Sequence, residues 1–239
     1  MPQRAPIADY LEALTRELSF DRSLAHRVRL EVEDHLWEAT TVSGDTSTEA
    51  QARAVMSFGE AREVAGQYAA LSLLRQARRS GAIIVLASGA IYIAMMGRVA
   101  WYGLMQWALS DTLRAAGKMV LAIDRAAYVL AFMFGAVGWA YISSRRVSPR
   151  FDAACRSQLN WSFRLALASA CPMAVSVIAD ATVTALRLLN ERPPPSVFLI
   201  PLLSIAIEVG FAAALVIVIG KTQRSTLRAS SQLSGRRVS

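Results

Sequence analysis

Three ionisable side chains, Arg98, Asp180 and Glu208, lie deep inside long apolar stretches of this sequence. Asp124 and Arg125 lie near the outer end of another such stretch, and we expect them to reach water or to pair locally. A charged group in the hydrocarbon of a bilayer is costly, so each of them needs a partner or a function. At the rise of an α-helix, Arg98 and Asp180 lie at similar depths, about 25 Å and about 22 Å from one membrane surface, and Glu208 lies at about 18 Å. We therefore expect an ion pair between Arg98 and Asp180, with Glu208 as a second partner or as a protonated acid.

Two interpretations of these three residues remain open. In the first, the ion pair fixes the order and register of packed helices. In the second, Asp180 and Glu208 line a polar path for a proton or a solute, as in a transporter. The first is preferred, because no second membrane carboxylate continues a path from Glu208.

A second group of ionisable residues lies near the start of the chain. Glu31, His35 and Glu38 fall at positions i, i+4 and i+7, so they share one face of a predicted helix. Such a set can in principle bind a divalent metal. A solvated face or a contact with a partner protein is preferred, with Trp37 and Leu36 adding apolar contacts, and no metal or other cofactor is predicted.

Catalytic residues are not predicted anywhere in the chain. The sequence contains no nucleophile elbow and no phosphate-binding glycine loop. The apolar stretches contain no histidine, which excludes a serine–histidine pair within a membrane. We therefore expect a protein that is not an enzyme.

The elements that position these residues are membrane helices. The chain has 239 residues, of which 54% are hydrophobic, and its mean hydropathy is +0.34, which is too apolar for an ordinary soluble domain. A transmembrane helix needs about 20 apolar residues. Four stretches are long enough, so we expect four helices in a lipid bilayer, at about 81–103, 120–142, 165–189 and 196–220.

Basic residues set the predicted orientation. Residues 1–79 contain 10 basic and 12 acidic side chains, whereas residues 80–239 contain 16 and 6. The surplus lies beside apolar stretches, where anionic lipid explains it better than direct binding of nucleic acid, which is not predicted. The positive-inside rule places both termini and the 145–164 loop in the cytoplasm. The basic residues expected to face lipid are Arg78, Arg79, Arg145, Arg146, Lys221 and Arg224.

The predicted fold class is all-α, with three parts. Residues 1–79 form a small cytoplasmic helical domain, residues 80–220 form the four-span membrane domain, and residues 221–239 form a basic tail. The tail is rich in serine and arginine, so we expect it to be disordered. In the first domain, Thr46 and Glu49 resemble a capping box at the start of a third helix, which Gly59 ends.

The last helix of the first domain is expected to run towards the first span, with Val64, Tyr68 and Leu71 on its apolar side.

The first domain resembles the HAAS signalling domain and the related permease-prefix domain. The shared pattern is E-x-x-x-H-L-x-E-A, a glycine turn, a Ser/Thr cap, E-A-x-x-x-A-x-x-x-F-G and a helix resuming with E-V-A. It covers about residues 8–66, and Glu60-Ala61 replaces the Asp-Pro that is usual in the family. The matching positions are Glu31, His35, Leu36, Glu38, Ala39, Gly44, Thr46, Glu49, Ala50, Ala54, Phe58, Gly59, Val64 and Ala65.

The resemblance implies a bacterial inner-membrane protein whose helical module passes signals, often alongside a PadR-like transcription regulator. The leading hypothesis is a non-enzymatic, multi-pass signal relay or regulatory adaptor that binds a cytoplasmic protein through Glu31, His35, Trp37 and Glu38. The alternative is a component of a membrane transporter or permease, in which Asp180 and Glu208 line a polar path. Either type of protein is compatible with a homo- or hetero-oligomer.

Overall fold

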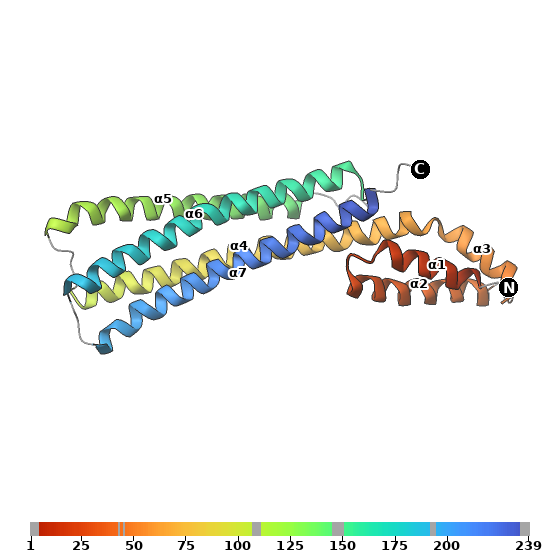
Figure 1. The fold of residues 1–239 in the computed structure, drawn as a ribbon, viewed down its shortest axis with the longest axis horizontal. Coiled ribbons are helices and arrows are strands. Elements are labelled where there is room, and N and C mark those ends of the chain that lie inside the picture. The colour runs from red at the N-terminus through yellow and green to blue at the C-terminus, as the bar shows by residue number, and fades with distance from the viewer. Residues whose placement is uncertain are drawn as a thin grey trace. The chain divides into compact units, whose positions relative to one another are not determined.

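The computed structural model describes residues 5–42, 44, 46–106, 111–144, 151–191 and 195–234. Within these residues the chain is all-α and contains no strand, which confirms the predicted fold class (Figure 1). The seven helices in this part of the chain are α1 (Pro6–Glu17), α2 (Arg22–Val42), α3 (Thr48–Phe58), α4 (Ala61–Leu104), α5 (Asp111–Ser144), α6 (Ala153–Glu191) and α7 (Pro195–Ser234).

The helices fall into two compact units. The head unit comprises Met1–Gln76, Arg146–Leu159 and Thr222–Ser239, and the bundle unit comprises Ala77–Arg145 and Asn160–Lys221. Helices α4, α6 and α7 therefore contribute residues to both units. The predicted parts are continuous in sequence, whereas the head unit combines three segments that are far apart in the chain.

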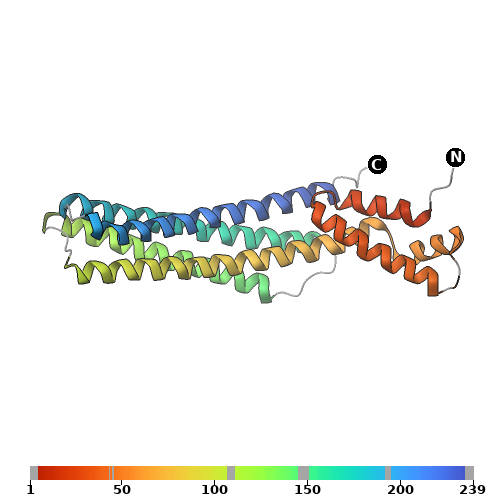
Figure 2. The same cartoon turned by 90° about the horizontal axis from the view of Figure 1, so that it is seen from below.

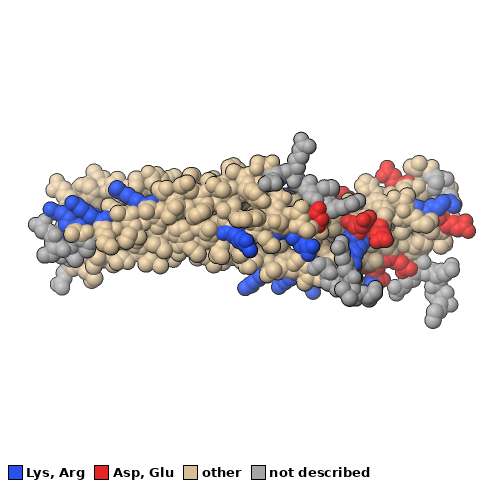
Figure 3. Space-filling view, turned by 90° about the horizontal axis from the view of Figure 1, so that it is seen from above, with Lys and Arg blue, Asp and Glu red and all other residues tan. Residues whose placement is uncertain are grey.

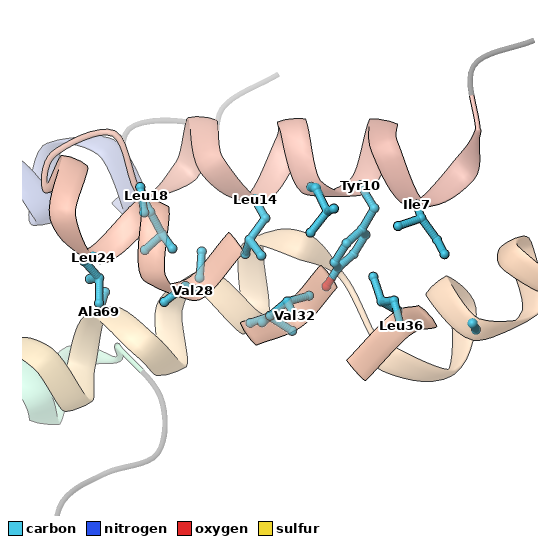
Figure 4. Close-up of a cluster of buried hydrophobic side chains, with 14 residues drawn as sticks. Ile7, Tyr10, Leu14, Leu18, Leu24, Val28, Val32, Leu36 and Ala69 are labelled. Atoms are coloured by element: carbon cyan, nitrogen blue, oxygen red, sulfur yellow. The ribbon is translucent and has the colours of Figure 1, made fainter. Parts of the chain in front are cut away.

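Apolar stripes on α1 and α2 form the core of the head unit. Ile7, Tyr10, Leu11 and Leu14 recur at helical spacing on α1, and each is at least nine-tenths buried. Figure 4 shows Ile7, Tyr10 and Leu14 on the side of α1 that faces α2, and Ala69 of α4 beside Leu24 of α2. The α2 residues of this core are Leu24, Ala25, Val28, Val32 and Leu36.

Local sequence signals fix the ends of α2 and α3. The Asp21 carboxylate accepts a hydrogen bond from the Leu24 amide (3.0 Å) at the start of α2. The cap of α3 is Ser47, whose hydroxyl accepts from the Ala50 amide (3.2 Å), so the predicted Thr46 cap is wrong by one residue. The Thr46 carbonyl instead accepts from the Gln51 side chain. Gly59 ends α3 at a φ of 102°, which favours glycine.

The buried side of α4 in the head unit differs from the prediction. Val64 is buried as expected, but Leu71 is 44% exposed. Ala65 and Ala69 are fully buried. Alanine lets two helices approach closely, so the small residues face the core and the larger leucine faces outwards.

The predicted disorder of residues 221–239 is wrong for residues 221–234, which continue α7. Ala229 is fully buried, and Leu233 packs against the core of the head unit. The Arg62 guanidinium donates to the Leu233 carbonyl (2.6 Å), and the Gln232 amide donates to the Ser19 hydroxyl (3.0 Å). The serine-rich composition predicted disorder. The residues that hold this segment in a helix lie far away in the sequence, so the local composition does not reveal them. Residues 235–239 lie outside the described residues.

Among the described residues, four helices are long and apolar enough to cross a membrane, so by length and composition this is a multi-pass membrane protein. In the bundle unit α4, α5, α6 and α7 lie lengthwise beside one another (Figure 2). The surface of this unit in Figure 3 is almost free of charged side chains along its middle. The candidate membrane-spanning segments are Ala61–Leu104 (α4), Gly117–Ser144 (within α5), Ala153–Leu189 (within α6) and Leu199–Leu233 (within α7). They contain the four predicted spans except the first three residues of the last one.

Glycines bring α4, α5 and α6 close together. A Cβ at Gly135 would lie 3.0 Å from Ile84 Cγ2 and 3.2 Å from Ser169 Oγ. A Cβ at Gly81 would lie 3.2 Å from the Trp139 ring. Small residues at such crossings are typical of membrane helix packing.

Candidate functional site

The bundle unit brings Arg98, Asp180 and Glu208 together from α4, α6 and α7. Arg98 Nη2 contacts Asp180 Oδ2 and lies 2.8 Å from Glu208 Oε1. The side chains are 0%, 13% and 1% exposed, respectively. The predicted ion pair is therefore present, and Glu208 is the second partner of Arg98. We call these three residues the charge triad.

Ser204 completes the surroundings of Glu208. It lies one turn earlier on α7, and its hydroxyl is 3.0 Å from both Glu208 Oε1 and the Ala94 carbonyl. A hydroxyl has one proton, so it donates to one of these acceptors at a time. Ser204 thus links α7 to α4 at the same level as the charge triad.

The hydrogen-bonding capacity of the triad is only partly used. Arg98 Nε and Nη1 and Glu208 Oε2 are buried and have no hydrogen-bond partner among the described residues. The same is true of Trp101 Nε1, three residues after Arg98 on α4. Each buried donor without a partner costs about 1–3 kcal/mol. This part of the bundle therefore contains buried polar atoms whose hydrogen-bonding capacity is unused.

Further polar side chains continue the site along α6. Ser176, Asp180, Thr184 and Arg187 follow one another at spacings of four, four and three, so they lie on one face of that helix.

Ser176, Thr184 and Arg187, the neighbours of Asp180 on this face of α6, each have a partner on another helix. The Ser176 hydroxyl donates to the Asp124 carboxylate, and the Tyr102 hydroxyl donates to Thr184 Oγ1 (2.9 Å). The Arg187 guanidinium lies 4.3 Å from the centre of the Tyr102 ring. The bundle therefore has a polar interior beyond the triad.

Asp124 was missed as a member of this interior. Its position beside Arg125 suggested a residue near the outer interface that reaches water or pairs locally, but Asp124 is only 2% exposed. The spacing of polar residues on α6, and of Arg98 and Tyr102 on α4, is the sequence signal that indicates a buried polar face needing partners.

A groove opens beside the triad between α4 and α7. Its volume is about 330 Å³, and its lining is mostly apolar. Arg98, Trp101 and Ser204 are the lining residues that carry polar groups; the others are Ala94, Gly97, Ala100, Leu104, Ile200, Leu203 and Ile207.

The predicted partner face lies on α2 in the head unit. His35 and Glu38 are exposed and lie 3.7 Å apart (His35 Nδ1 to Glu38 Oε2), and Trp37 is 40% exposed. Glu31 accepts a hydrogen bond from the Tyr68 hydroxyl (3.1 Å). Leu36 belongs to the core, so its predicted contact with a partner is wrong.

No group of three His, Cys, Asp or Glu side chains in the described part of the chain is arranged to hold a metal ion.

The basic residues predicted to face lipid have different surroundings. Arg78 is partly buried, and its Nε donates to the Ile142 carbonyl (3.1 Å), so it also joins α4 to α5. Arg79, Lys221 and Arg224 are exposed. Arg145 and Arg146 lie outside the described residues.

No family model, curated protein or solved structure matches this chain.

Proposed function

We propose that this protein is a non-enzymatic signal relay or regulatory adaptor of the bacterial inner membrane, which binds a cytoplasmic protein through the head unit. The observation that carries the proposal is the exposed Trp37 on a helix whose opposite side is fully packed. Tryptophan is enriched in protein interfaces because it offers a large apolar surface with one hydrogen-bond donor. The exposed His35 and Glu38 add polar groups near it on the same helix.

Further support comes from Leu30, which is seven residues before Trp37 and so lies on the same side of α2; it is 55% exposed. The resemblance to the HAAS domain also favours a signalling partner, with a PadR-like regulator as the first candidate. Because basic residues flank alternate spans, we place both termini in the cytoplasm.

The charge triad supplies the other end of the proposed relay. Arg98 on α4 and Glu208 on α7 are joined in the bundle unit. The same two helices supply Val64 and Leu233 to the core of the head unit. A ligand or a membrane change that separates the pair would act on helices that extend into the head unit.

Photocrosslinking in living cells tests the partner surface. A photoreactive amino acid replaces Trp37 in the full chain, and the control carries it at Met56 on α3, which is 74% exposed. We expect a discrete adduct with one cytoplasmic protein from position 37, which Glu38→Lys weakens. Identical adducts from both positions, or only lipid adducts from position 37, would contradict the proposal.

Transport is the second candidate function, and the groove beside the triad is the observation that favours it. Asp180 and Glu208 would then line a polar path. Their pairing with one arginine, and the 1% exposure of the Glu208 side chain, favour the relay. Proton uptake by liposomes containing the purified protein separates the two. Uptake that Asp180→Asn abolishes without loss of folded protein would support transport.

A further inference from the structure

The groove between α4 and α7 combines an apolar lining with buried donors. It lies where α4 approaches its end at Leu104 and where α7 begins at Pro195. Arg98 is six residues before Leu104, which is about 9 Å along the helix. In a bilayer this depth is close to the glycerol and headgroup region of one leaflet, where tryptophan is also favoured.

Two residues of this groove carry three nitrogen atoms that lie beneath its apolar surface and need an acceptor. Arg98 Nε, Arg98 Nη1 and Trp101 Nε1 are buried without a hydrogen-bond partner among the described residues, and both residues line the groove. The Arg98 side chain is 0% exposed. A molecule in the groove that offers oxygen atoms would remove the cost of leaving these donors unpaired when the Arg98 and Trp101 side chains turn towards it.

The acceptor is best a neutral oxygen. The Arg98 guanidinium already faces two carboxylates, those of Asp180 and Glu208, so a further anion would be repelled. An ester carbonyl accepts hydrogen bonds without adding charge. The rest of the lining, including Ala94, Leu203 and Ile207, is apolar and suits a hydrocarbon chain.

A helix of a second copy fits this groove less well. The backbone carbonyls of a membrane helix are already hydrogen-bonded within the helix, so they offer little to three free donors. Gly97 and Ala100 leave space at the lining that a flexible acyl chain can fill. A Cβ added at Gly97 would meet no atom within 4 Å.

We propose that this groove binds a glycerophospholipid, with an ester carbonyl at Arg98 and Trp101 and an acyl chain along the apolar lining. The inference goes beyond the proposed function and does not depend on it. It assigns a ligand class to the donors that the charge triad leaves unused, and it places the head of that ligand beside Arg98.

The test uses the purified full chain in nanodiscs. One sample contains a diester phospholipid with a photoreactive acyl chain, and the other contains the matching diether lipid, which lacks the carbonyls. Mass spectrometry then measures labelling of residues 94–104 and 200–207. We expect roughly fivefold more labelling by the diester lipid, because a hydrogen bond contributes about 0.5–1.5 kcal/mol.

Two variants locate the site. Gly97→Leu fills the groove and is expected to lower labelling at least to the diether level. Gly89→Leu is the matched control, because a Cβ there also meets nothing within 4 Å and Gly89 does not line the groove. Trp101→Phe keeps an aromatic side chain, although a smaller one, and removes a donor, and we expect it to reduce the difference in labelling between the two lipids.

Equal labelling by both lipids in the unmodified chain would overturn the proposal. So would adducts between two copies of the chain at residues 94–104, which would identify the groove as a subunit interface. Size-exclusion chromatography and circular dichroism check that each variant is folded. If Gly97→Leu does not fold, Trp101→Phe decides the outcome: an unchanged preference for the diester lipid would overturn the assignment.

Discussion

Glu208 Oε1 lies 2.8 Å from Arg98 Nη2, although 110 residues separate them in the sequence. The contact joins α4 to α7, the first and last spans of the bundle unit. Asp180 attaches α6 to the same nitrogen. One guanidinium thus fixes the relative register of three membrane helices.

Removing this guanidinium should strongly destabilise the folded protein. Arg98→Met leaves the Asp180 and Glu208 carboxylates buried without a cation, so we expect the free energy of unfolding to fall by about 3–5 kcal/mol. Denaturant unfolding in detergent micelles, followed by circular dichroism, measures the change. Adding Asp180→Asn and Glu208→Gln to the same chain should restore much of the loss. A single variant as stable as the parent would show that the triad does not hold the bundle together.

Ser204→Ala should have a smaller effect. It removes a hydroxyl placed 3.0 Å from both Glu208 Oε1 and the Ala94 carbonyl, so we expect a loss of about 1 kcal/mol. Thr182→Ala is the control, because the Thr182 hydroxyl is exposed and bonds only to the Ile178 carbonyl of its own helix. The same unfolding assay compares the two, and equal effects would argue against a link between α7 and α4 at Ser204.

Leu233→Asp should open the head unit. Leu233 packs against the core formed by α1 and α2, so a carboxylate there is expected to cost several kcal/mol, about 3 or more. Hydrogen exchange of the α1 amides, measured by mass spectrometry, should accelerate. Leu227→Asp is the matched control, because Leu227 is on the same helix and is 58% exposed. Unchanged exchange in Leu233→Asp would mean that the end of α7 does not support the head unit.

Tyr10 should make the head unit sensitive to alkaline pH. Burial raises the pKa of Tyr10 to about 12, and Tyr68 adds to the shift. The unfolded chain loses this proton at a pKa of about 10, so the stabilisation is complete below pH 10 and is lost as the pH rises towards 12. Tyr10→Phe should remove this part of the pH dependence.

The same variant should cost little at neutral pH, because the Tyr10 hydroxyl has no hydrogen-bond partner in the described part of the chain. Thermal unfolding of the parent and of Tyr10→Phe between pH 7 and pH 11 tests both expectations. If the stability of both proteins changes with pH in the same way, Tyr10 does not cause the alkaline sensitivity.

Depth along a helix allowed the central ion pair to be predicted. Arg98 and Asp180 were matched because a fixed rise per residue converts position into depth. The same reasoning failed for Asp124, because hydropathy placed the start of its span near residue 120, whereas α5 begins at Asp111. A residue assigned to the interface is therefore more than three turns inside its helix.

The burial of a side chain was hardest to predict where it depends on residues that are distant in the sequence. Leu36 and Trp37 are neighbours with similar hydrophobicity, yet one is fully buried and the other is 40% exposed. The helical spacing of Leu24, Val28, Val32 and Leu36 favours a core position for Leu36, which the predicted partner contact did not take into account. No local signal indicates whether a further element covers Trp37. The helical state of residues 221–234 likewise depends on contacts with Arg62 and Ser19.

The contact between Arg62 and the Leu233 carbonyl spans 171 residues and has a consequence for biogenesis. The ribosome completes α1, α2 and α3 long before it reaches Leu233, and all four apolar helices begin before that residue emerges. Leu233 can therefore pack against the core of the head unit only after the apolar stretches of the membrane helices have been synthesised. Completion of the head unit is thereby a late step in synthesis of the chain.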